Sequence, residues 1–137
     1  MYKWNTQAIG MMENNKKRPV HLDLLHIRLP VGGVVSILHR ITGVALVLSL
    51  PAAIFLLRES LLDPEGYGRV SALLQSLPMR ILLYLLLLAV GHHFFAGVRH
   101  LLLDIDIGIS RSGSRRGAWL VLAAVAAITA MGLFIIW

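Results

Sequence analysis

The chain has 137 residues, of which 57% are hydrophobic and 15% are charged, and its formal net charge is +6. A soluble domain of this size could not hide so much apolar surface, so the composition excludes an ordinary globular fold and favours lipid as the solvent. The absence of cysteine excludes disulfides, cysteine-ligated iron–sulfur clusters and thioether-attached haem, and the lack of a basic face with interleaved aromatic residues argues against a nucleic-acid partner.

The N-terminal segment, residues 1–29, is predicted to lie in the cytoplasm. It carries charged residues between Glu13 and Arg18 and has no apolar core before them, unlike a secretory signal. Arginine and serine are too scarce there for a mitochondrial transit peptide. A bacterial inner membrane is therefore the expected setting, with His21 and His26 at its surface.

Three apolar segments predict an all-α integral membrane protein with three transmembrane helices in a single membrane-anchor domain, 1–137. The spans are expected at about 31–57, 79–103 and 118–137. At about 1.5 Å per residue, each is long enough to cross a hydrocarbon core of about 30 Å.

The two connections between the spans differ in composition and in charge. Residues 58–78 contain DPEGYG and predict a turn-rich connection, whereas 104–117 contain SRSGSRRG and predict a polar loop. The N-terminal segment and the second connection together carry eight Lys and Arg residues, against three around the first connection. Because positively charged ends stay inside, the N-terminus is predicted to be cytoplasmic and the C-terminus periplasmic.

The first span opens with a polar stripe. At helical spacing, one face carries Gly32, Ser36, His39, Arg40 and Gly43. Ionisable side chains within a span are costly, so they face protein and mark a site, while the glycines allow close helix approach. Ser36 and Arg40 are one turn apart, so a hydroxyl and a guanidinium can hydrogen-bond a quinone carbonyl and stabilise the charge that develops on reduction.

The second span ends with another polar stripe. His93, Gly97, His100 and Asp104 follow one another at spacings of 4, 3 and 4 residues and share a face. His93 lies ten residues before Leu103, about 15 Å along the helix and close to the bilayer midplane. An imidazole at that depth can ligate haem iron, and Gly97 leaves clearance for the flat macrocycle one turn further on.

A haem at this depth needs partners for its propionates and a second axial ligand. The basic side chains on the inner half of the two spans are His39, Arg40, Arg99 and His100. Propionates are anions and pair with such groups. One chain offers one clear mid-membrane ligand, so a bis-histidine haem takes its second histidine from another subunit. Protons for the quinone can arrive from the inner side through Asp104 or water.

Structural interpretations of these residues stay open beside the functional ones. His93 can simply pack against a facing helix and hydrogen-bond to it. The side chains of Arg40 and Arg99 can extend to the membrane interface. The glycines can serve only to let helices pack closely. His92, on a neighbouring stripe with Arg99, is expected to face lipid headgroups or another subunit. The presence of two such clusters favours a cofactor site, because the first and second spans each bring histidine and arginine to the same side of the membrane and the third span brings none.

Two motifs resemble those of a known family. RPVHLDLLHIRLP precedes SILHRITG, and HHFFAGVRHLLLD ends the second span; over essentially the whole chain they resemble the cytochrome b subunit of succinate dehydrogenase. The resemblance implies a heteromeric helix bundle in which the chain pairs with a second small anchor subunit, shares one b-type haem and docks an iron–sulfur subunit and a flavoprotein on the inner face. Electrons from succinate would pass through FAD and iron–sulfur clusters in those partners to ubiquinone.

The resemblance also implies a role for each matching residue. His93 matches the haem axial ligand of the pattern H-x-x-x-G-x-R-H, because it alone of the adjacent His92 and His93 keeps the spacing of four to Gly97. Ser36 and Arg40 match the serine and arginine of the quinone site.

The remaining polar residues match positions around the haem edge. His39 matches the histidine beside the propionates, and the polar end of the second motif, near the propionates and the proton path, is matched by Arg99, His100 and Asp104.

The sequence thus predicts a membrane anchor that takes part in quinone reduction but does not itself oxidise succinate, since it has no flavin or dinucleotide motif. The rival interpretation is a non-redox scaffold or transporter subunit whose His/Arg cluster serves assembly or proton relay. A b-type haem band in the purified complex distinguishes the two.

Overall fold

The structure, a computed structural model, describes residues 29–136. This part of the chain is built of α-helices joined by short links and contains no strand, which confirms the predicted all-α class. The predicted cytoplasmic segment 1–29, including His21 and His26, lies outside the described residues except for Leu29.

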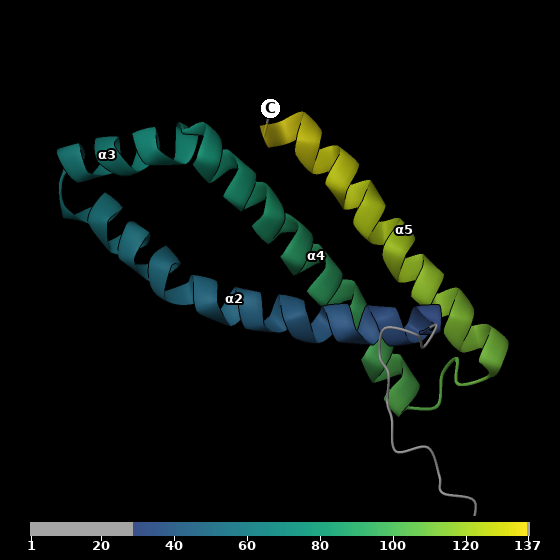
Figure 1. Cartoon of the computed structure of the whole chain (residues 1–137). Coiled ribbons are helices and arrows are strands. Elements are labelled where there is room, and N and C mark those ends of the chain that lie inside the picture. The colour runs from purple at the N-terminus through teal and green to yellow at the C-terminus, as the bar shows by residue number, and fades with distance from the viewer. Residues whose placement is uncertain (1–28, 137) are drawn as a thin grey trace, which may run out of the picture.

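Three of the described helices are long and apolar enough to cross a membrane. They are α2 (Val31–Leu62), α4 (Leu77–Asp104) and α5 (Arg111–Ile136). The α2 and α4 helices include the first two predicted spans, and α5 includes the third as far as Ile136. Each helix extends beyond its span where polar residues continue it. Pro51 lies inside α2, which curves along its length (Figure 1); the ring removes one backbone donor and is tolerated in membrane helices.

The first connection differs from the prediction because it contains a helix, α3 (Pro64–Gln75). The DPEG sequence forms a helix start rather than a free turn. The Asp63 side chain accepts a hydrogen bond from the amide of Gly66, and Pro64 occupies the first turn, the positions that suit these residues at a helix N-terminus. A Cβ on Gly66 would collide with the carbonyl oxygen of Glu59 on α2, so a glycine lets α3 fold back tightly.

The second connection is shorter than the predicted 104–117 loop, because α5 begins at Arg111. The α4 helix ends in a Schellman turn, in which the amide of Ile107 donates to the carbonyl of Leu102 and Asp106 adopts φ 62°. Ser110 then caps α5, its hydroxyl accepting from the amide of Gly113 at 3.0 Å. Polar capping residues therefore start the last helix before its apolar stretch.

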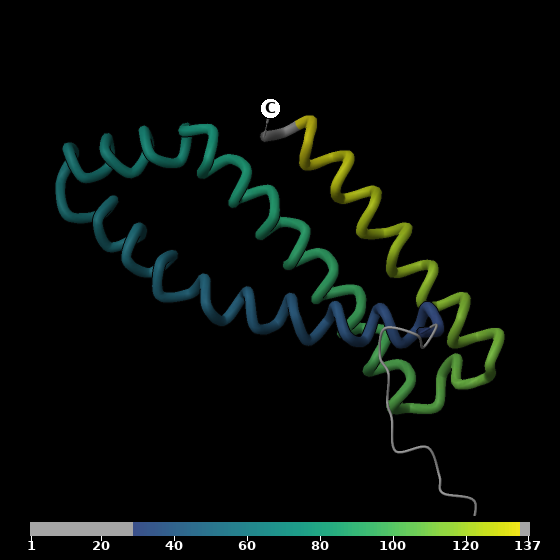
Figure 2. Tube along the Cα trace, viewed as in Figure 1, coloured from purple at the N-terminus to yellow at the C-terminus, as the bar shows by residue number. Residues whose placement is uncertain are grey.

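The helices converge at one end and spread at the other (Figures 1 and 2). The start of α2, the end of α4 and the start of α5 meet at what we term the polar end, where Gly32 and Ser114 both contact the Arg99 side chain. The end of α2, the whole of α3 and the start of α4 form what we term the corner end. The α4 and α5 helices run side by side between the two ends.

The core between the helices is small and made largely of small side chains. It consists of Val35, Ala96, Ala118 and Val121. Small residues let membrane helices pack closely without a hydrophobic driving force. Large apolar residues are exposed along all three long helices, for example Leu48 at 72% and Leu120 at 70%. Such faces suit lipid or helices of other subunits.

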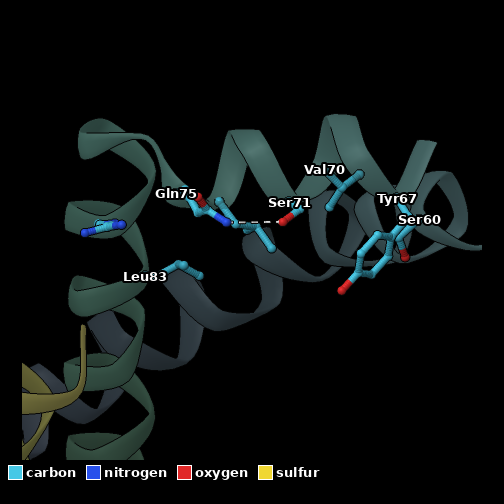
Figure 3. A pocket seen from close by; sticks show the side chains of 8 residues that line it. Ser60, Tyr67, Val70, Ser71, Gln75 and Leu83 are labelled. Atoms are coloured by element: carbon cyan, nitrogen blue, oxygen red, sulfur yellow. Dashed lines mark hydrogen bonds between the residues drawn. The ribbon is translucent and has the colours of Figure 1, made fainter. Parts of the chain in front are cut away.

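The corner end encloses a cavity of about 450 Å³. Figure 3 shows Tyr67, Ser71 and Gln75 of α3 pointing toward it, with the Gln75 amide donating to the Ser71 hydroxyl at 3.3 Å. Glu59 on α2 pairs with Arg69 on α3 at 3.9 Å. The ion pair links α3 to α2, whereas the hydrogen bond lies within α3. No histidine lies among the residues that line this cavity.

Candidate functional site

The closest polar contact between α2 and α4 is made by two histidines. The rings of His39 and His93 stack with centroids 4.1 Å apart and an interplanar angle of 8°. His93 Nδ1 lies 3.1 Å from the backbone carbonyl oxygen of His39 and 3.4 Å from the hydroxyl of Thr42. The two predicted stripes therefore meet at these residues.

The carbonyl contact, the shorter of the two at Nδ1, favours the tautomer of His93 that carries its proton there. A carbonyl oxygen can only accept, so the hydrogen bond requires the proton on Nδ1 and leaves the Nε2 lone pair available for another partner. Metal-ligating histidines usually donate their second ring nitrogen to such an oxygen. This arrangement orients His93 as a ligand would be oriented.

Glycines make room for both rings. A Cβ on Gly43 would lie 3.0 Å from Cε1 of His93, and a Cβ on Gly97 would lie 3.3 Å from Nε2 of His39. Both distances are tighter than normal carbon contacts. In this structure Gly97 accommodates the His39 ring, whereas the sequence predicted clearance for a macrocycle at that position.

His100 extends the cluster toward the polar end. Its ring centroid lies 5.2 Å from that of His39, at an interplanar angle of 60°. The stripe predicted from the spacing of His93, Gly97 and His100 is therefore a real face, directed at α2. Asp104, predicted to continue it, is exposed in the last turn of α4.

A groove of about 490 Å³ runs beside this cluster. Its walls include His39, Arg40, Gly43 and His93, and it continues over apolar residues of α2 such as Val47. Arg40 is exposed and Ser36 is half-buried one turn earlier. The groove thus joins an imidazole, a guanidinium and an apolar channel along a membrane helix.

The adjacent His92 lies in a different environment. It is buried, with 5% of its surface exposed, and neither ring nitrogen has a hydrogen-bond partner. The prediction that it faces headgroups or another subunit is wrong for this reason: it shares the inward face of α4 with Ala96, a core residue. One residue of helical rotation separates it from the face that carries His93.

Arg99 shares that inward face and ties α4 to α5. It is 8% exposed, and its Nη2 donates to the carbonyl and the hydroxyl oxygens of Ser114, at 3.3 and 3.0 Å. A Cβ on Gly32 would lie 3.1 Å from the same nitrogen. Gly32, placed on the quinone-site stripe by its spacing, therefore opens space for Arg99.

Two contacting residues were missed by sequence reasoning. Thr42 approaches His93, and the only sequence signal for it was its place inside SILHRITG, three residues after His39. Ser114 accepts from Arg99 but sits in a serine-rich stretch that predicted a loop. Within residues 29–136, no group of three or more His, Cys, Asp or Glu side chains is arranged to hold a metal ion.

The fold and the site define a multi-span membrane protein with a histidine cluster between two of its helices. A sequence model of the family described as "Succinate dehydrogenase/Fumarate reductase transmembrane subunit" matches residues 14–132. The chain belongs to this family, which confirms the resemblance drawn from the two motifs.

Two curated relatives agree with the family match. The chain is similar to the succinate dehydrogenase cytochrome b556 subunit of Coxiella burnetii (strain RSA 493 / Nine Mile phase I), with 34% identity over 108 residues that cover 78% of this chain and 86% of the relative. It is also similar to the cytochrome b556 subunit of Paracoccus denitrificans, with 26% identity over 122 residues that cover 89% of this chain and 94% of the relative.

Proposed function

We propose that this chain is the membrane-anchor cytochrome b subunit of a succinate dehydrogenase, and that it binds one b-type haem together with a second anchor subunit. The observation that carries the proposal is the hydrogen bond from His93 Nδ1 to the carbonyl of His39. It leaves Nε2 free in a chain whose relatives are named as b-type cytochromes.

The residues around His93 fit a haem. His93 would hold the haem iron through its ring nitrogen, and Gly43 and Gly97 keep bulk away from the two imidazole rings. The haem propionates would pair with His39, Arg40 and His100, on the side toward the polar end. Arg99 is directed at Ser114 on another face of α4, so we leave it out of the propionate set predicted from the sequence. When bound, the haem supplies a one-electron redox centre within the membrane.

We also propose that Ser36 and Arg40 form part of the ubiquinone site. They lie one turn apart on α2, and Arg40 lines the groove beside His93. The Arg40 guanidinium donates to a quinone carbonyl and stabilises the negative charge that develops on reduction, while the Ser36 hydroxyl donates to the same end of the ring. Asp104, exposed at the end of α4, is the proposed entry for protons.

The proposed complex contains further subunits. A second small anchor would supply the other haem ligand, because His39 and His100 are assigned to the propionates and His92 is enclosed by its own chain. An iron–sulfur subunit and a flavoprotein would deliver electrons from succinate through FAD and iron–sulfur clusters. The polar end would face the cytoplasm of a bacterium and the C-terminus the periplasm, as the lysine and arginine counts favour.

The rival function, a non-redox scaffold or transporter subunit, predicts the same burial but no cofactor. The complex purified through a tag on this chain decides between them by its reduced-minus-oxidised spectrum. We expect a b-type haem band. A complex of full subunit composition without that band would contradict the cytochrome proposal.

The quinone role has its own experiment. Arg40→Gln should lower quinone reduction by about 10- to 100-fold, as expected for the loss of a charged hydrogen bond, and Ser36→Ala should lower it less. Succinate oxidation by a soluble artificial acceptor should stay unchanged in both. The matched controls are Arg58→Gln and Ser49→Ala, which lie on the same helix away from the groove. Equal quinone activity in variants and controls would refute the role.

A further inference from the structure

The polar end holds a second cavity that the proposed haem and quinone sites do not use. It has a volume of about 660 Å³ and lies between the starts of α2 and α5. The lining residues that matter for its chemistry are Gly32, Arg99, Arg111, Ser114, Arg115 and Trp119. None of the residues that line the groove at His93 contributes to it.

The cavity concentrates positive charge. Arg99 is more than nine-tenths buried and lines the cavity, with its Nη2 held by Ser114, another lining residue. Arg111 and Arg115 add two charges from the first turns of α5, where helix amides also favour an anion. The ion pairs found within residues 29–136 involve Arg58 and Arg69, not these three arginines. An anion would balance this charge.

The depth of the cavity identifies the anion. It lies where three spanning helices begin or end, the level at which headgroups meet the hydrocarbon. Trp119 stands eight residues into α5, about 12 Å along its axis, and tryptophan prefers this interfacial layer. Trp119 is itself 56% exposed, so its ring offers apolar surface to an acyl chain at the edge of the cavity.

We propose that this cavity binds the phosphate headgroup of an anionic phospholipid from the leaflet at the polar end. Arg99 and Arg115 hold the phosphate, and Trp119 borders the glycerol and the first acyl carbons. Basic pockets between membrane helices are the sites that recognise such headgroups. The inference does not rest on the haem or quinone assignments, because it uses none of their residues.

The test uses the complex purified through a tag on this chain, stripped of lipid with mild detergent and titrated with phosphatidylglycerol in native mass spectrometry. Arg115→Gln should weaken binding by about fivefold, the effect of one arginine near a headgroup. The matched control is Arg58→Gln at the corner end, an arginine with a 68% exposed side chain that does not line the cavity. It should change binding by less than about twofold, well under the effect expected for one such charge.

Four results would overturn the proposal. They are equal weakening by Arg115→Gln and Arg58→Gln, equal binding of phosphatidylethanolamine, displacement of the lipid by inorganic phosphate at the same concentration, and no binding because a partner subunit covers the cavity. Arg99→Gln removes a buried side chain and can disturb folding, so the test relies on Arg115→Gln, which changes an exposed residue. The thermal unfolding midpoint of the complex serves as a folding control and should be the same in both variants.

Discussion

The polar end and the corner end of the bundle use charged and glycine residues for opposite purposes. At the corner end, Glu59 pairs with Arg69, and Gly66 admits a backbone carbonyl, so the polar groups are consumed in holding α3 in place. In the histidine cluster that leads toward the polar end, Gly43 and Gly97 instead admit imidazole rings, and His93 hydrogen-bonds the main chain of α2 through one ring nitrogen. The same residue types thus build a structural corner in one place and a candidate site in the other.

The largest effect is expected from substituting the two adjacent histidines near the polar end. His93→Ala should abolish the b-type haem band of the purified complex, because it removes the nitrogen that would bind iron. His92→Ala should keep the band, since its ring is enclosed on the face that packs with the core. The reduced-minus-oxidised spectrum of each variant is the measurement. Loss of the band in His92→Ala alone would reverse the assignment.

A smaller loss of haem is expected when the His93 ring is displaced by a neighbouring side chain rather than removed. Gly43→Leu places a side chain where even a Cβ lies 3.0 Å from His93 Cε1, so haem content per complex should fall between the wild-type and His93→Ala values. Gly33→Leu is the control, because its nearest neighbour is Pro30 at 3.7 Å. Equal haem content in both variants would show that Gly43 does not set the position of the ring.

The corner end offers a matched pair of glycines within α3. Gly66→Ala should lower the stability of the complex by about 1–3 kcal/mol, the usual cost of overpacking, because its Cβ would collide with the Glu59 carbonyl. Gly68→Ala meets nothing within 4 Å and should stabilise α3 by up to about 1 kcal/mol. Thermal unfolding of the purified complex measures both. Neither variant should change the haem content of the complex. A change would mean that packing at the corner end affects the histidine cluster.

The smallest effects are expected at the helix termini and should have opposite signs at the two ends. Asp63→Ala removes the cap of α3 and should cost about 1 kcal/mol. Asp106→Gly, at φ 62° in the turn after α4, should gain up to about 1 kcal/mol, because glycine adopts that conformation freely. Thermal unfolding again measures both, and a loss of stability in Asp106→Gly would mean that its carboxylate has a further role.

The spans and the polar stripes were predictable because each depends on periodicity within one helix. The facing of His93, Gly97 and His100 follows from spacing alone and is present in the structure. The α3 helix was missed because Asp, Pro and Gly mark turns as well as helix starts, and the tertiary contact of Gly66 with Glu59 decides between them. The burial of His92 was missed because periodicity places a residue on a face but does not say which neighbouring helix covers it.

Arg99 and Gly32 show the same limit at the polar end. Their motifs placed them beside the candidate haem and quinone sites, but the crossing of α2 over α4 brings both to α5 instead. A helix crossing angle depends on side-chain volumes at the contact, and no single-helix pattern contains it.

The hydrogen bond that orients His93 has a consequence for genetics. Its acceptor is the main-chain oxygen at residue 39, so no exchange of the side chain at that position can delete it. A library that replaces residue 39 would change the stacking partner of His93 while leaving its protonation geometry intact. Scanning mutagenesis at position 39 would therefore measure only the effect of losing the imidazole. It would not detect the contribution of the backbone carbonyl to the site.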